Sequence, residues 1–346
     1  MKIINNPNRE SWSEVLKRPT QTVGDIEATV TEIFTKVSET GDVAIKRFTK
    51  KFDGISLESN VVTPNEIELA VQRVPEKLQK AIRLAKQNIE VFHTAQKTSR
   101  TAIETAKGVQ CWQEKRPIQK VGLYIPGGTA PLFSTVLMLA VPAQIAGCKD
   151  IVLCSPPNKE GILAPEILFA AQLCGITKII KVGGIQAIAG LTFGTETIPQ
   201  VYKIFGPGNQ FVTVAKQLAT KYGVAIDMPA GPSELLVVAD KTANASYIAS
   251  DLLSQAEHGT DSQVILVSTS KRLIDEVSAE VGIQLEVLPR KSIAEKAIAN
   301  SKLIYVENDD IALELINEYG PEHFIICCEN EDLYIDGISN AGSVFI

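Results

Sequence analysis

Two short segments hold the residue types that bind metal ions and move protons. Gln255 and His258 stand three positions apart in LLSQAEHG, at the end of a predicted helix, so their side chains share one helix face and can converge on one ligand. Glu322 and His323 are adjacent in YGPEHF. A carboxylate beside an imidazole provides two neighbouring proton acceptors, which suits stepwise removal of protons from a substrate.

Each segment also has a simpler structural explanation. His258 could be a helix C-terminal histidine beside the negative end of the helix dipole, and Gln is an uncommon zinc ligand. Glu322 and His323 could form an ion pair at a strand edge. They precede a buried strand, and α/β proteins place active sites there only if the strand polarity suits. The residues alone leave these alternatives open.

Glycine-rich turns follow several apolar runs, in YIPGGTAP, KVGGIQAIAG, IFGPGNQ and MPAGPSE. Such turns let backbone N–H groups approach a phosphate at a helix N-terminus. None matches G-x-G-x-x-G, and no acidic residue ends the second strand, where a ribose partner is expected. Asp150 precedes that strand, at its wrong end. Tight turns without a ligand therefore fit the spacing as well as a nucleotide site does.

The elements that must position these residues form two regions. Apolar residues at helical spacing predict helices over 25–39, 64–74 and 76–94, followed by a strand or hairpin between Val109 and Lys120. From Val121 onward, apolar runs without polar alternation are separated by helical segments, which is typical of strands buried on both faces of a parallel sheet. Each helix of this series ends at a glycine able to adopt the left-handed conformation, at positions 147, 175, 194, 223, 259 and 320.

The repeated strand–helix order predicts an α/β protein with two Rossmann-like, doubly wound domains, one inserted in the other. Residues 121–235 form the predicted inserted domain. Residues 236–346 form the other domain, together with the helical N-terminal region 1–120. At 346 residues the chain is long enough for two such cores.

Composition excludes several classes of function. The net charge of -6 argues against a nucleic-acid surface, because phosphate binding needs a local excess of Lys and Arg. No apolar run is long enough to span a bilayer, and the N-terminus MKIINNPNRESW lacks the apolar core of a signal peptide. The 6 cysteines show no paired CxxC pattern, which favours reduced thiols in a cytoplasmic protein.

Taken in order, the longer segments resemble the histidinol dehydrogenase family. They are GLYIPGGTAPLFSTVLMLAVPAQIAGC, GGIQAIAGLTFGTETIPQVYKIFGPGN, DMPAGPSELLVVAD, LLSQAEHGTDSQVILV and YGPEHF, and the resemblance covers essentially the whole chain. It implies a homodimer of two Rossmann-like domains, an NAD cofactor, a bound zinc ion and L-histidinol as the substrate.

The resemblance also implies roles for individual residues, motif by motif. Glu322 and His323 match the acid/base pair. Gln255 and His258 match zinc ligands, which also face the substrate that the metal orients, and Ser233 in GPSE matches a substrate-contacting residue. The positions that contact NAD are matched by Tyr124, Gln186 and Asn209.

The implied reaction is oxidation of L-histidinol to L-histidine through L-histidinal, with two successive hydride transfers to NAD. Zinc fixes the substrate by its amino and imidazole nitrogens, as an orienting template. His323 takes the alcohol proton and contacts the substrate, and Glu322 activates the water that hydrates the aldehyde. His323 then assists the second hydride transfer. No cysteine nucleophile is required.

The chain departs from the family pattern at its end, where it stops at Ile346 inside the apolar run AGSVFI. The family continues with an aspartate and a histidine that complete the zinc sphere, and with a tail that reaches into the partner subunit. Zinc sites use three or four protein donors, so a chain with two is expected to bind zinc poorly and to be weakly active, as a truncated form. The alternatives are a related dehydrogenase of another small amino alcohol and a truncated, inactive form.

Overall fold

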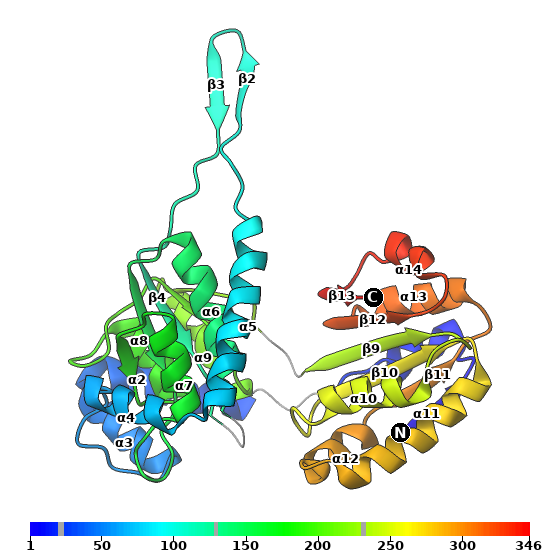
Figure 1. Cartoon of the computed structure of the whole chain (residues 1–346), viewed down its shortest axis with the longest axis horizontal. Helices are drawn as coiled ribbons and strands as arrows, with labels where there is room; N and C mark the ends of the chain where they lie inside the picture. Colours follow the sequence, from blue (N-terminus) through cyan, green and yellow to red (C-terminus); the bar gives the residue numbers. More distant parts are fainter. Residues whose placement is uncertain (20–23, 128–130, 230–232) are drawn as a thin grey trace. The chain divides into compact units, whose positions relative to one another are not determined.

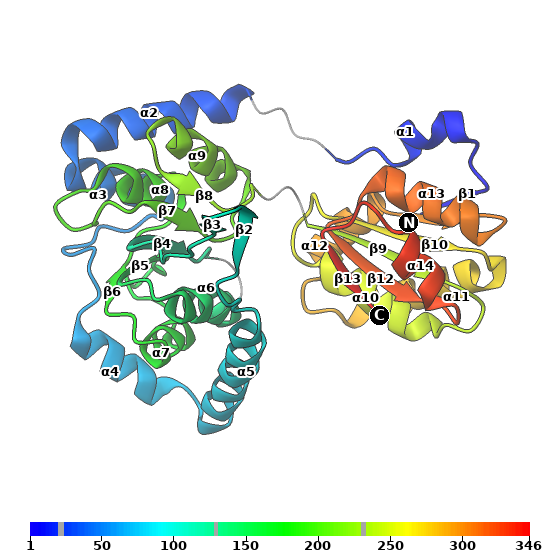
Figure 2. The same cartoon turned by 90° about the horizontal axis from the view of Figure 1, so that it is seen from above.

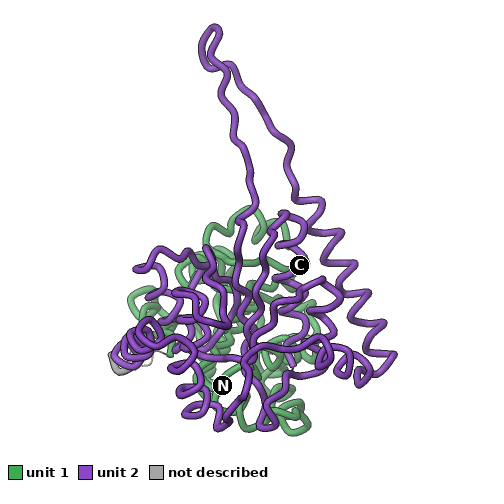
Figure 3. The backbone as a smooth tube through the Cα atoms, turned by 90° about the vertical axis from the view of Figure 1, so that its left-hand side faces the viewer, with its two compact units in different colours: residues 1–22, 231–346 green, residues 23–230 purple. Residues whose placement is uncertain are grey.

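The computed structural model describes residues 1–19, 24–127, 131–229 and 233–346. It forms two compact units, which Figure 3 distinguishes by colour. The first unit contains residues 1–22 and 231–346, and the second contains residues 23–230. Among the described residues, no helix is both long and apolar enough to cross a membrane.

The first unit is built on a six-stranded sheet with the order β1-β11-β10-β9-β12-β13, in which all neighbours are parallel. Every residue of the central strands β9 and β10 is buried, which explains their unbroken apolar sequences. The strands are β1 (Lys2–Asn5), β9 (Glu234–Ala239), β10 (Gln263–Ser268), β11 (Lys302–Tyr305), β12 (His323–Cys327) and β13 (Ser343–Phe345).

Helices cover both faces of this sheet (Figures 1 and 2). Alternate residues of β9 belong to different cores, because successive side chains of a strand point to opposite faces: Leu235 packs in the core with α10, α11 and α12, and Leu236 in the core with α1, α13 and α14. The helices are α1 (Trp12–Val15), α10 (Ala245–Ala256), α11 (Lys271–Val287), α12 (Lys291–Ala299), α13 (Asp309–Tyr319) and α14 (Glu331–Gly337), after a 3₁₀ turn at Arg9–Ser11.

The second unit contains a five-stranded parallel sheet with the order β6-β5-β4-β7-β8. The chain moves outward from β4 to β6 on one side and then returns to β7 and β8 on the other, so the winding direction reverses between β4 and β7. Its elements are β4 (Lys120–Tyr124), α6 (Phe133–Ala146), β5 (Asp150–Cys154), α7 (Pro165–Leu173), β6 (Lys178–Ile180), α8 (Gly184–Phe193), β7 (Lys203–Phe205), α9 (Gln210–Lys221) and β8 (Ala225–Ile226). The predicted α/β class with two doubly wound sheets is confirmed.

The N-terminal helices lie in a different unit from the one predicted. They are α2 (Gly24–Thr40), α3 (Asp42–Phe52), α4 (Pro64–Arg73) and α5 (Glu76–Ala95). Helices α2 and α3 share a core with α8 and α9, and α4 and α5 share one with α6 and α7 (Figure 2). The physical reason is that α8 is buried from Ile185 to Thr192, so it needs cover on the side away from its sheet. Residues 24–95 therefore do not join residues 236–346.

Smaller differences concern the two ends of the N-terminal region and one glycine. The first residues form the edge strand β1, which pairs with β11, where a helical region was predicted. A hairpin is present, but it begins earlier than predicted: its strands are β2 (Ala102–Ala106) and β3 (Val109–Trp112), and only β3 lies between Val109 and Lys120. The hairpin extends as an arm from the second unit (Figures 1 and 3). Five of the predicted helix-ending glycines have positive φ; Gly259 does not.

Candidate functional site

Five of the predicted site residues lie at the amino-terminal edge of the first unit's sheet. Ser233 and Glu322 directly precede β9 and β12, and His323 begins β12 beside Leu235. Helix α10 leads back to the same edge before β10 begins, and it carries Gln255 in its last turn with His258 just beyond. This polarity is opposite to the usual rule, which places ligands at the carboxyl ends of parallel strands.

Glu322 and His323 are held by the backbone of a single residue, Glu234. The Glu234 N–H donates to Oε2 of Glu322 over 3.1 Å, and the Glu234 carbonyl oxygen lies 3.1 Å from Nδ1 of His323. A carbonyl oxygen only accepts, so Nδ1 carries a proton in this contact, and in the neutral imidazole Nε2 is then the unprotonated nitrogen. Nδ1 of His323 also lies 3.5 Å from Oε2 of Glu322. The imidazole therefore has a defined tautomer beside a carboxylate.

Gln255 and His258 present donor atoms that other side chains do not occupy. Gln255 is half-buried and His258 is exposed, and in the described part of the chain neither side chain makes a hydrogen bond. Two donors are fewer than the three or four of a protein zinc site. Within the described ranges, no group of three or more His, Cys, Asp or Glu side chains could hold a metal ion. These two residues alone are therefore too few to form a zinc site.

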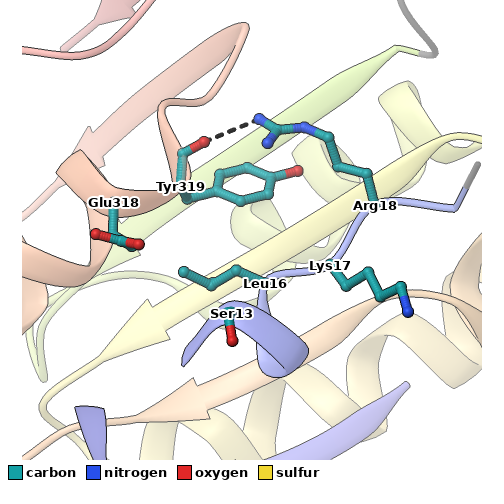
Figure 4. A pocket seen from close by; sticks show the side chains of 6 residues that line it. All are labelled: Ser13, Leu16, Lys17, Arg18, Glu318 and Tyr319. Carbon is teal, nitrogen blue, oxygen red and sulfur yellow. Dashed lines mark hydrogen bonds between the residues drawn. The ribbon is translucent and has the colours of Figure 1, made fainter. Parts of the chain in front are cut away.

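Two of the pockets in the described part of the first unit are lined by none of the five candidate residues. One of about 270 Å³ is formed by Ser13, Leu16, Lys17, Arg18, Glu318 and Tyr319. In Figure 4 the Arg18 guanidinium extends to the Tyr319 carbonyl. The other, of about 360 Å³, lies beside the first strands of the sheet and shares Lys17 and Arg18. The candidate side chains therefore lie outside both cavities, along the sheet edge.

The predicted NAD-contacting residues lie at the carboxyl edge of the second unit's sheet. Tyr124 ends β4, Gln186 lies in the first turn of α8 after β6, and Asn209 is the N-cap of α9 after β7. Tyr124 and Asn209 thus flank the point between β4 and β7 where the winding reverses, which is where open α/β sheets bind ligands. The turns at 128–130 and 230–232, which the sequence also indicated, lie outside the described residues.

Tyr124 and Gln186 are nearly fully buried, with exposed fractions of 3% and 1%. The Tyr124 hydroxyl accepts the Gly184 N–H over 3.0 Å, and burial raises the pKa of Tyr124 to about 12, so this hydroxyl is neutral. Gln186 Nε2 donates to Asp53 over 3.4 Å. The Tyr124 hydroxyl therefore holds the turn at Gly184 and the Gln186 amide is bonded to Asp53, whereas Asn209 is exposed.

Asp53 was missed by the sequence analysis, because it lies after α3 and far from β5 along the chain. Its carboxylate accepts from Gln186, and burial raises its pKa above the usual range. The structure thus brings an acidic group to the carboxyl edge, where the end of the second strand offers none.

The turn between β7 and α9 is fixed by charged groups. The Gly206 N–H donates to Asp227 over 2.8 Å, and Lys216 Nζ donates to the Gly206 carbonyl over 2.7 Å. Lys216, which is 3% exposed at its side chain, also forms an ion pair with Asp227. The Asn209 side chain accepts the Val212 N–H over 3.1 Å. This arrangement presents the N-terminus of α9, which favours anionic groups.

The chain is similar to histidinol dehydrogenases over its whole length. Residues 16–346 match a family model described as histidinol dehydrogenase. The enzyme of that name from Bacteroides thetaiotaomicron is 55% identical over 346 residues, which are 100% of this chain and 81% of the relative. One from Escherichia coli O6:H1 is 50% identical over 345 residues, 99% of this chain and 79% of the relative. A crystal structure of histidinol dehydrogenase from Elizabethkingia anophelis matches with a TM-score of 0.97 and 51% identity, covering 100% of this chain and 80% of that one.

Proposed function

The chain belongs to the histidinol dehydrogenase family, and from that premise we propose that it oxidises L-histidinol to L-histidine through L-histidinal, in two hydride transfers to NAD. Membership makes it an oxidoreductase of histidine biosynthesis. The cofactor, the metal ion and the residue roles are the proposed part. The observation that best supports the proposed reaction is the pair of proton acceptors Glu322 and His323, both held by Glu234.

His323 is the general base of the first oxidation. Its Nδ1 proton is engaged by the Glu234 carbonyl, so Nε2 is the nitrogen free to accept the alcohol proton. As the O–H bond breaks toward Nε2, the carbon-bound hydrogen leaves with its electron pair. NAD supplies the hydride acceptor when it is bound. The product of this step is the aldehyde, and His323 returns its proton to solvent.

Glu322 acts between the two oxidations. Its carboxylate takes a proton from water while the water oxygen adds to the aldehyde carbon, and it returns this proton to the former carbonyl oxygen, which gives the hydrate. His323 then accepts an O–H proton of the hydrate as the second hydride leaves, and the product is the carboxylic acid. Glu322 is exposed and His323 half-buried, so both groups can exchange protons with solvent between steps.

NAD is assigned to the carboxyl edge of the second unit. The exposed Asn209 amide and the N-terminus of α9 suit the polar and anionic parts of a dinucleotide. Tyr124 and Gln186 support the adjacent turn through Gly184 and Asp53.

The stoichiometry of the reaction tests the proposed function. The purified chain is incubated with limiting L-histidinol and excess NAD, and NADH and histidine are quantified. Two NADH per histidine are expected. One NADH per L-histidinol consumed, with accumulated aldehyde, would contradict the proposed role of Glu322 in hydrating the aldehyde. Turnover of another amino alcohol in preference to L-histidinol would favour a related dehydrogenase, and no turnover with any of them would favour an inactive form.

Zinc is proposed to bind Gln255 and His258 together with at least one further donor. His258→Asn should weaken zinc binding by more than the roughly 10–100-fold typical of losing a group that only supports a ligand. Zinc content after dialysis against graded chelator measures this. The control is Ser254→Ala on the same helix, whose hydroxyl donates to the Asp251 carbonyl. Equal zinc retention by both variants would contradict the assignment.

A homodimer is also proposed, and the arm formed by β2 and β3 supports it. Every residue of both strands is exposed, including Ile103 at 60% and Trp112 at 51%. Large apolar side chains exposed together in this way are uncommon on a monomeric protein. Replacing Ile103 and Trp112 by Lys should shift the chain toward monomer in sedimentation equilibrium. Replacing exposed Val287 by Lys serves as the control. A monomeric parent chain, or an arm variant that stays dimeric, would oppose this proposal.

A further inference from the structure

Arg18 and Glu234 form an ion pair beside the Glu322–His323 pair. Arg18 Nε and a terminal nitrogen bond the two carboxylate oxygens of Glu234 over 2.5 and 2.8 Å, which is the two-point geometry that Arg makes best. The Glu234 side chain is only 10% exposed. Its carboxylate is therefore held in one place by Arg18, beside the Tyr319 side chain.

The same guanidinium fixes the segment that leads into Glu322 and His323. It donates to the carbonyls of Tyr319 over 2.9 Å and Gly320 over 3.3 Å, and it lies 4.4 Å from the centre of the Tyr319 ring (Figure 4). The Tyr319 hydroxyl donates to Gln263 over 3.1 Å, and Gln263 donates to the Lys17 carbonyl over 3.0 Å. This series of hydrogen bonds therefore ends at Lys17, the residue before Arg18.

Glu234 connects this network to both proton acceptors. Its side chain binds Arg18, while its N–H and carbonyl contact Glu322 and His323. A partly buried ion pair is weak grounds for stability, because desolvation offsets much of the attraction. The contacts of the Arg18–Glu234 pair suggest a role in positioning. The pair connects the start of β9 with the segment that precedes β12, and the distance between these two segments determines the contact between His323 and the Glu234 carbonyl.

We propose that Arg18 and Glu234 are positioning residues that hold His323 in the tautomer with a free Nε2. This rests on the proposed role of His323 as the base. Without the pair, the segment that leads into His323 loses its hydrogen bonds from Arg18 to the Tyr319 and Gly320 carbonyls, so the imidazole can leave the Glu234 carbonyl and populate the tautomer in which Nε2 carries the proton. The fraction of enzyme able to accept the alcohol proton falls, whereas NAD binding at the second unit is unaffected.

Two variants and a control test the proposal. Glu234→Gln keeps the side-chain size but removes the charge, and Arg18, 40% exposed at its side chain, can then be solvated. The double change Arg18→Met with Glu234→Met leaves no unpaired buried charge. Arg9→Met is the control, because Arg9 pairs with Glu314 on the same N-terminal segment at 75% side-chain exposure.

Both test variants should lower kcat about 10–100-fold, with KM for NAD unchanged. Nitrogen-15 NMR of histidine-labelled protein should show His323 moving from the Nδ1–H form toward a mixture. The chain has only 3 histidines, so His323→Asn assigns its signal. Arg9→Met should change neither kcat nor the tautomer.

Three results would overturn the proposal: an unchanged kcat, an unchanged His323 tautomer, or a matching loss in Arg9→Met. A fall in kcat with the tautomer preserved would indicate a purely structural role. If the double variant does not fold, Glu234→Gln decides. If His323→Asn itself keeps normal turnover, the proposed base is wrong. If it abolishes turnover while Glu234→Gln is fully active, only the positioning role is lost.

Discussion

His323→Asn should lower kcat by roughly 10²–10⁴-fold, the contribution typical of a general base, and leave the NAD dissociation constant nearly unchanged. Asn keeps a polar side chain that can still donate to the Glu234 carbonyl, so the strand start is preserved, but it cannot accept a proton at neutral pH. The NAD site is assigned to the other unit, so cofactor binding should not follow the loss of turnover. Steady-state kinetics and calorimetric titration of NAD measure the two quantities separately.

His93→Asn is the matched control for this prediction. His93 lies near the end of α5 in the second unit, and its Nδ1 is 2.7 Å from Gln96. The substitution removes an imidazole without touching either sheet edge, so kcat should stay within about twofold of the parent, as for most surface changes. Near-normal turnover of His323→Asn would refute the base assignment. An equal loss of kcat in both variants would indicate a general loss of structure and not the loss of a catalytic base.

Much of the secondary structure follows from local signals in the sequence. Helix α13 spans residues 309–319 as predicted, because Asn308 caps it by accepting the Ile311 N–H and Gly320 ends it at φ 59. The strands of both sheets also follow from unbroken apolar runs. These signals depend on neighbours a few residues apart, which is why one sequence suffices to find them.

The positions that the sequence could not supply depend on distant contacts. Arg18 and Glu234 are 216 positions apart, and no sequence pattern indicates that they form an ion pair. Asp53 reaches Gln186 across 133 positions. Strand β1 is four residues long and mostly exposed, so it has no periodicity to read. Strand polarity at Glu322 likewise became clear only from the parallel register with β9.

Gly206→Ala should destabilise the second unit by roughly 3–5 kcal/mol, the sum of backbone strain and overpacking. Gly206 has φ 135, which L-residues rarely adopt. An added Cβ would overlap the Tyr124 carbonyl oxygen and lie 2.9 Å from its carbon. That carbonyl cannot retreat, because β4 is bonded to β5 on one side and to β7 on the other. Urea unfolding of the parent and the variant measures the difference.

Gly223→Ala separates the two causes of this loss. Gly223 also has a positive φ, of 83, but nothing lies within 4 Å of a Cβ placed there, so only the left-handed penalty of about 1–2 kcal/mol applies. The excess at Gly206 then reports how closely the β7–α9 turn approaches the end of β4. That approach brings Asn209 and the N-terminus of α9 to the point where the winding reverses. Equal losses at both glycines would mean that the turn is loose, and the assigned NAD edge would lose its structural basis.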